Sequence, residues 1–161
     1  MRIRQHLYNI DKPKGLYPNY MNPETGKWGQ LHVSMGALGD SFYEYLFKLW
    51  LWSGKTDVQA KEMYDKAMPA IEAHILQTSE GGLMYFGNYL NNRVDHKMEH
   101  LACFSGGLYA LSAPHAKDPE HYMNIAKGIT NTCHESYART RTLLCGIHHF
   151  SYVAKYLSYS L

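Results

Sequence analysis

The sequence has 161 residues, with 16 basic and 14 acidic side chains and a formal net charge of +2. This length predicts at most one domain, or a piece of a larger one. The near balance of charge gives no electrostatic reason to expect nucleic acid or an anionic membrane as a partner. No apolar run reaches the ~18 residues typical of a transmembrane helix, so no membrane segment is expected in this chain.

The high tyrosine content has two possible explanations, and the cysteines exclude some kinds of site. Fourteen Tyr and three Trp suit a carbohydrate-binding surface, where sugars stack on aromatic rings, and suit a tyrosine-rich helical core equally well. The three cysteines, Cys103, Cys133 and Cys145, include no CxxC pair. A redox pair or a zinc knuckle is therefore not expected, and an odd count fixes no disulfide framework by itself.

The N-terminal residues predict a helix and then a long loop. Ile3, Leu7 and Ile10 recur at spacings of four and three, which is typical of one helix face. A sequence that begins inside a helix pattern, with no signal peptide before it, suggests a truncated chain. Between residues 11 and 39, prolines and glycines exclude helix over most of the stretch, and loops of this length are often functional.

The remaining residues predict helices and one β-hairpin. The hairpin is expected to have strands at 83–90 and 93–96 around an Asn91-Asn92 turn. Helical pairs joined by long loops or small hairpins predict an all-α fold with a small β-hairpin, as part of an α/α toroid. The helices are expected at about 41–52, 58–77, 101–111 and 121–139.

The helix expected at 41–52 carries many apolar residues. Its core-facing stripe is predicted from helical periodicity. The predicted members of this stripe are Phe42, Tyr45, Leu46, Leu49 and Trp50.

Two carboxylates at the start of this helix are candidates for chemistry. Asp40 follows the glycine-rich stretch "MGALG" and stands at an N-cap or first-turn position, where a plain capping role is one interpretation. Because hydrogen bonding and the macrodipole at a helix N-terminus favour the ionised carboxylate, a catalytic Asp40 would suit an anionic role rather than that of a general acid. Glu44 lies one turn further on the same face, and its alternative role is that of a solvated helix carboxylate.

Several separated motifs then resemble one family. The stretches "GLYPNYMNP", "TGKWGQLHVSMGALGDSFYEYLFKLWL", "GGLMYF", "HKMEHLACFSGGLYALSA" and "CHESYART" closely resemble the class I α-1,2-mannosidases, glycoside hydrolase family 47. The resemblance runs in order over residues 1–141 and is greatest to the Golgi branch. Residues 142–161 depart from the family pattern and are expected to form a divergent tail.

The resemblance implies a fold and an activity. The family has a seven-hairpin (αα)7 barrel with a β-hairpin at one end, so residues 1–141 are expected to be a segment of such a barrel. It removes terminal α-1,2-linked mannose from high-mannose N-glycans with inversion, and it requires calcium. Of its three catalytic acidic residues, the resemblance implies a counterpart in this chain only for Asp40. The other two, and the calcium-binding threonine, have no counterpart here.

The resemblance also assigns substrate-binding positions. His100 corresponds to the active-site histidine of the family, although a lone histidine beside an apolar run is otherwise more often a core residue. Leu38 occupies the position where the endoplasmic reticulum branch has an arginine that can clamp a glycan branch, which implies the broader Golgi preference. Glu44 is included as a sugar-facing candidate. Glu99 stands where the Golgi branch usually has glycine, so the packing beside His100 is expected to differ.

Disulfide pairing and localisation follow from the resemblance as well. Cys103 and Cys133 match the family's disulfide pair and imply an oxidising secretory lumen, with the Golgi as the expected compartment. Cys145 has no family partner.

Three hypotheses on function result. The chain belongs to an inverting mannosidase and is inactive alone, or it is a non-catalytic module that binds mannose glycans or a protein partner, or it is an unstable truncated product.

Overall fold

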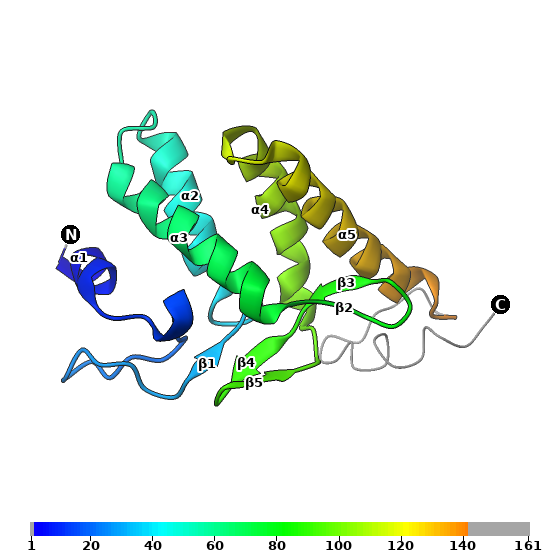
Figure 1. Ribbon diagram of the computed structural model, residues 1–161, viewed down its shortest axis with the longest axis horizontal. Helices are drawn as coiled ribbons and strands as arrows, with labels where there is room; N and C mark the ends of the chain where they lie inside the picture. The colour runs from blue at the N-terminus through cyan, green and yellow to red at the C-terminus, as the bar shows by residue number, and fades with distance from the viewer. Residues whose placement is uncertain (1, 142–161) are drawn as a thin grey trace.

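The computed structural model describes residues 2–141 as a mainly helical structure with two small sheets (Figure 1). The expected tail, 142–161, and Cys145 lie outside the described residues. The helices are α1 (Arg2–Asn9), α2 (Asp40–Trp52), α3 (Val58–Ile75), α4 (Phe104–Ser112) and α5 (Pro119–Ala138), and short 3₁₀ turns lie at Pro13–Gly15, His100–Cys103 and Ala113–His115. The strands are β1 (His32–Val33), β2 (Leu76–Thr78), β3 (Met84–Phe86), β4 (Asn88–Leu90) and β5 (Arg93–Asp95).

Two helical hairpins make up most of the structure. Helix α2 packs on α3, α4 packs on α5, and α2 also contacts α4. In Figure 1 the two hairpins stand side by side, and both sheets lie at one end of them. This arrangement agrees with the predicted succession of helical pairs and leaves one end of the helices next to the loops that carry the candidate site.

The predicted hairpin is present as β4 and β5, but its first strand is shorter than predicted, because residues 84–86 belong to a second sheet. Strand β3 pairs with β2, and the three-stranded sheet has the order β1-β4-β5. The break lies at Gly87, where a Cβ atom would stand 2.8 Å from Val94 Cγ1 and 2.9 Å from the carbonyl oxygen of Asp95. Residues 83–90 were expected to form one strand. Strand β2 directly follows Ile75, so it begins inside the range 58–77 that was expected to be helical. The Asn91-Asn92 turn itself is confirmed, with φ of 46° and 68°, as a two-residue hairpin requires.

The core face of α2 also differs from the prediction. The structure buries Tyr43, Leu46 and Phe47, whereas Tyr45, a predicted member of the face, is 54% exposed. Nine of the thirteen residues of this helix are apolar or aromatic, so periodicity alone cannot select one stripe. Contacts with both α3 and α4 decide which side is covered.

The interior supports the interpretation of a tyrosine-rich core. The phenol of Tyr64 is buried between helices and donates to Ser112 Oγ at 2.9 Å. Buried phenols in helical packing thus account for part of the tyrosine content, as the amphipathic character of this side chain allows. The largest fully buried side chains include Tyr43, Phe47, Tyr64, Phe86, Tyr109, Met63, Met68, Ile71 and Ile75.

A disulfide joins the start of the second helical hairpin to its end. Cys103 and Cys133 are bonded and lie 30 residues apart in the sequence, which confirms the pairing that the resemblance implied. Within residues 2–141, the structure contains no helix with the length and apolarity needed to cross a membrane.

Substitution of two neighbouring glycines in α4 tests how closely α4 and α5 pack. A Cβ at position 106 would lie 2.6 Å from Thr130 Oγ1 and 3.3 Å from the Ala126 carbonyl oxygen, whereas a Cβ at position 107 meets nothing within 4 Å. We expect Gly106→Ala to lower the free energy of unfolding by about 1–2 kcal/mol, because α5 must shift. Gly107→Ala is the matched control and should raise it by up to about 1 kcal/mol. Urea denaturation measures both changes, and equal effects would contradict the close contact.

Removal of the disulfide is expected to destabilise the chain. The double variant Cys103→Ser/Cys133→Ser should lose roughly 3–4 kcal/mol of unfolding free energy, because the bond closes a 30-residue loop in the unfolded chain. Chemical denaturation under oxidising conditions measures the loss, with Cys145→Ser as the control. Peptide mapping that found Cys145 bonded to Cys103 or Cys133 would contradict the pairing.

Candidate active site

The loop before α2 is held in a tight turn that excludes side chains at two positions. A Cβ at Gly39 would lie 2.1 Å from the carbonyl oxygen of Ser34, and one at Gly36 would lie 2.4 Å from Glu99 Oε2. Both contacts are far below van der Waals distance, so glycine is required at each position. The backbone N–H of Gly36 donates to Ser34 Oγ at 2.7 Å. These contacts fix the chain immediately before Asp40.

Asp40 lies in the first turn of α2 and is half-buried. Its backbone N–H donates to the carbonyl oxygen of Gly36 at 2.9 Å. Its Oδ1 accepts from the backbone N–H of the adjacent Ser41 at 2.8 Å. The residue at the N-cap position is Gly39, and it makes no side-chain cap. Of the two positions that the sequence left open for Asp40, the structure selects the first turn.

Two other aspartates show what a capping carboxylate does in this fold. Asp57 accepts from the backbone N–H of Ala60, and Asp118 accepts from that of His121. Both bonds reach three residues ahead, which is the ordinary N-cap geometry. Asp40 differs from both because its side-chain bond reaches only the next residue.

Glu44 is placed one turn after Asp40, in a groove between α2 and α4. Its carboxylate accepts from Lys48 Nζ at 2.6 Å. Both residues line a cavity of about 240 Å³ together with Phe104 and Leu108. Glu44 is therefore an ion-paired groove residue, and its pair is only partly exposed.

Leu38 projects from the turn toward solvent. Its side chain belongs to a residue that is 66% exposed, and its φ of 72° lies in the left-handed region that leucine rarely adopts. Such a conformation persists only where the surrounding contacts impose it. Here the two glycine contacts on either side supply that constraint.

An aromatic pocket lies beside this turn. It has a volume of about 270 Å³, and its wall includes Leu38, Gly39 and the rings of Tyr17, Trp28 and Phe42. The Tyr17 and Phe42 ring centroids are 4.9 Å apart. The pocket combines packed aromatic walls with the exposed turn residue, so it could accept a small molecule that has an apolar face.

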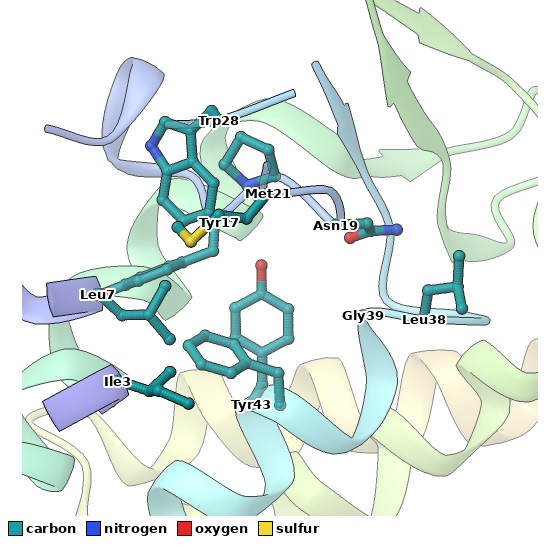
Figure 2. A pocket seen from close by; sticks show the side chains of 11 residues that line it. Ile3, Leu7, Tyr17, Asn19, Met21, Trp28, Leu38, Gly39 and Tyr43 are labelled. Carbon is teal, nitrogen blue, oxygen red and sulfur yellow. The ribbon is translucent and has the colours of Figure 1, made fainter. Parts of the chain in front are cut away.

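Tyr43 extends from α2 into this pocket. Figure 2 shows its hydroxyl pointing away from the helix into the pocket. Among the described residues this buried hydroxyl has no hydrogen-bond partner, and neither does the Asn19 side-chain nitrogen. The Tyr17 backbone amide favours the ionised form of the Tyr43 phenol and partly offsets the rise of its pKa. The pocket therefore has polar atoms that a bound hydroxyl or a water molecule could satisfy.

Burial sets the ionisation of the pocket tyrosines. Loss of hydration raises the pKa of the Tyr17 phenol to about 12, with a smaller contribution from Tyr8. Burial also raises the pKa of Tyr43, and the nearby Tyr17 adds to this shift. Both phenols are neutral at physiological pH, so each can donate a hydrogen bond.

Glu99 connects the turn to the three-stranded sheet. Its Oε2 accepts from the backbone N–H of Ala37 at 2.6 Å, and its Oε1 accepts from Asn88 Nδ2 at 3.2 Å. The packing beside His100 was expected to differ because position 99 holds a glutamate, and these contacts show what that glutamate does. The side chain occupies the space next to Gly36 and holds the turn.

His100 follows Glu99 at the start of a 3₁₀ turn and is half-buried. Its Nε2 is hydrogen-bonded to the hydroxyl of Tyr137 on α5. Glu99 bonds to Ala37 of the turn before Asp40 and is the chain neighbour of His100, whereas Glu44 lies in a different groove. No role was predicted from the sequence for Tyr43, Asn88 or Tyr137, although Tyr43 and Tyr137 lie within the motifs "GDSFYEYL" and "CHESYART".

The family's calcium requirement would need a set of metal ligands. Residues 2–141 contain no group of three or more His, Cys, Asp or Glu that could hold a metal ion. Oxygen-rich ligand sets are what Ca²⁺ needs, so this part of the chain does not fit a calcium centre by itself.

Comparison with known proteins identifies close relatives. Mannosyl-oligosaccharide alpha-1,2-mannosidase IA of Drosophila melanogaster is 60% identical over 144 residues, which are 88% of this chain and 22% of the relative. Mannosyl-oligosaccharide 1,2-alpha-mannosidase IC of Homo sapiens is 57% identical over 144 residues, which are 88% of this chain and 23% of the relative. The chain thus spans about a fifth of the length of these curated relatives.

A solved structure shows the same fold. The alpha-1,2-mannosidase from Trichoderma reesei matches with a TM-score of 0.76 at 20% identity, over 89% of this chain and 31% of that chain. At this identity the likeness concerns the fold alone.

The family model described as glycosyl hydrolase family 47 matches residues 1–154. This match extends beyond the boundary expected at residue 141, where the described structure ends, so the boundary stays a prediction. The match covers well over half of the chain and agrees with the relatives. The chain therefore belongs to glycosyl hydrolase family 47.

Proposed function

We propose that this chain is a segment of an inverting glycosidase that removes terminal α-1,2-linked mannose from high-mannose N-glycans. Family membership and relatives whose names describe mannosyl-oligosaccharide mannosidases support the proposal. Because the chain spans about a fifth of those relatives, the activity is proposed for a longer protein that contains it. Its two helical hairpins are proposed to form part of the (αα)7 barrel.

Asp40 is the proposed catalytic carboxylate, and one observation carries this assignment. Asp40 lies one position after the N-cap residue Gly39, and its side-chain bond reaches only the next amide, whereas Asp57 and Asp118 occupy N-cap positions and are engaged there. It also lies beside an α-helix N-terminus, where the macrodipole favours an anion. An inverting glycosidase needs a carboxylate that holds or activates water on one face of the sugar, and an ionised Asp40 suits that role.

The neighbouring residues are proposed to contact the sugar. Leu38 is exposed on the turn beside Asp40, and it offers an apolar contact where an arginine would offer several donors. This favours the broader, Golgi-type trimming preference. Glu44 and His100 are proposed to face other parts of the glycan. The Cys103–Cys133 bond suits the oxidising lumen of the secretory pathway, and the Golgi is the proposed compartment.

Calcium remains a proposal for the longer protein. Family 47 membership is consistent with a calcium-dependent enzyme, but the described residues have no cluster of His, Cys, Asp or Glu ligands for it. Asp40 and its neighbours are therefore assigned only to water and sugar contacts.

A second candidate function is binding of a mannose glycan without hydrolysis. The pocket beside Leu38, with aromatic walls and the unpaired Tyr43 hydroxyl, favours it. Aromatic faces and a buried donor are the features expected of a small polar ligand site. This candidate predicts glycan binding by the chain even when Asp40 is replaced.

The catalytic assignment predicts the behaviour of Asp40→Asn in a chimeric enzyme, in which residues 1–141 replace the matching stretch of the Drosophila relative. Asparagine keeps the shape and the acceptor for the Ser41 amide but removes the charge. Mannose release should fall at least about a hundredfold. The unfolding free energy should change by no more than about 1 kcal/mol.

Asp118→Asn is the matched control for this experiment. Asparagine also caps helices well, so both turnover and stability should stay near the values of the unmodified chimera. Turnover of the Asp40 variant that equals that of the Asp118 variant would make Asp40 a structural residue.

The 161-residue chain by itself is expected to release no mannose from α-1,2-mannobiose, with or without added calcium. The resemblance gives this sequence only one of three catalytic carboxylates, and the loss of each such group costs orders of magnitude in rate. Chromatographic detection of mannose measures the outcome. Robust calcium-dependent release by the purified chain would contradict the proposed division of the active site.

A further inference from the structure

The Glu99 carboxylate joins two segments that are far apart in the sequence. One oxygen accepts from the backbone N–H of Ala37, 62 residues away, at 2.6 Å. The other oxygen accepts from the side-chain amide of Asn88, the first residue of β4, at 3.2 Å. A carboxylate that accepts from a backbone amide forms one of the stronger hydrogen bonds in proteins. Glu99 therefore ties the loop before α2 to the three-stranded sheet.

The turn is packed directly against the stem of this glutamate as well. A Cβ at Gly36 would lie 2.4 Å from Glu99 Oε2 and 2.8 Å from Glu99 Cβ. The Gly36 carbonyl oxygen accepts from the amides of Gly39, at 3.2 Å, and Asp40, at 2.9 Å. A displacement of Gly36 would consequently be passed to the start of α2.

We propose that Glu99 is a positioning residue that fixes the Gly36–Gly39 turn and thereby sets where Leu38 and Asp40 lie relative to His100. His100 is the next residue in the chain, so one anchor places both sides of the candidate site. The anchoring stands on the contacts alone, and its effect on turnover rests on the proposed function. Glu99 acts through Asp40 and is not assigned a contact with the sugar.

At position 99, side-chain length should matter more than charge for holding the Gly36–Gly39 turn. Glu99→Gln keeps the length and one acceptor oxygen for the Ala37 amide. Glu99→Asp keeps the charge but is one methylene shorter, so its carboxylate is expected to fall short of the Ala37 amide, which now lies 2.6 Å from Glu99 Oε2. Glu99→Ala removes the anchor. The order of retained function is therefore expected to be Glu, then Gln, then Asp and Ala together.

Amide hydrogen exchange of the 161-residue chain, followed residue by residue by NMR, tests the anchoring. In Glu99→Ala and Glu99→Asp the Ala37 amide should exchange about tenfold faster, because it loses a charge-assisted bond. In Glu99→Gln the increase should be about threefold or less, because a neutral acceptor remains. The amide of Ile71, in the buried core of α3, should keep its rate in all variants. Glu80→Ala, in the exposed turn after β2, is the control and should change neither amide.

Two exchange results would overturn the anchoring. One is an unchanged Ala37 rate in Glu99→Ala. The other is an equal rise at Ala37 and Ile71, because it would mean general destabilisation rather than release of the turn.

Kinetics of the chimeric enzyme test the consequence for turnover. Glu99→Ala and Glu99→Asp should lower kcat about tenfold with a smaller change in KM, since a misplaced catalytic group slows chemistry more than binding. Glu99→Gln should restore most of the rate. A faster Ala37 amide with unchanged kcat would overturn the positioning role. If instead Asp40→Asn keeps full turnover, the proposed function fails while the exchange result still decides whether Glu99 anchors the turn.

Discussion

The turn at Gly36–Gly39 has no room for a side chain at either end, and the geometry of the candidate site depends on that constraint. Gly39 lies against the Ser34 carbonyl and Gly36 against Glu99. The turn between them forces Leu38 into a left-handed conformation and points it to solvent. The contacts that restrict the backbone are thus the same contacts that present Leu38 and Asp40 at the end of the helical hairpins. Strained conformations of this kind cluster at functional sites.

The carboxylates of this chain have different structural roles. Asp57 and Asp118 cap helices, Glu44 pairs with Lys48, and Glu99 holds the loop to the sheet. Asp40 has none of these roles, because its side-chain bond reaches only the amide of the next residue. A half-buried acid that is placed by a rigid turn but is little used by the fold is a reasonable site for chemistry.

The tyrosines serve packing and the candidate site at once. Tyr64 and Tyr109 donate to partners within the helical core, so their burial costs little polar desolvation. Tyr43 is equally buried, yet its hydroxyl is unpaired and points into the aromatic pocket (Figure 2). The composition could not separate these roles, because the same side chain suits a core and a sugar-binding wall.

The sequence by itself determined the helices, the Asn91-Asn92 turn, the family and the identity of the Cys103–Cys133 pair. The helices and the turn rest on local periodicity and turn chemistry, and the family and the disulfide pair rest on several motifs that resemble one family. Only the tertiary structure decided that 76–78 pairs with 84–86, which face of α2 is buried, and that Glu99 reaches Ala37. The buried face of α2 and the Glu99 contact depend on residues far apart in sequence, and the pairing of 76–78 with 84–86 competes with a continuous strand over 83–90. Local pattern cannot rank such alternatives, because the deciding contacts exist only once the helical hairpins and the sheets have packed together.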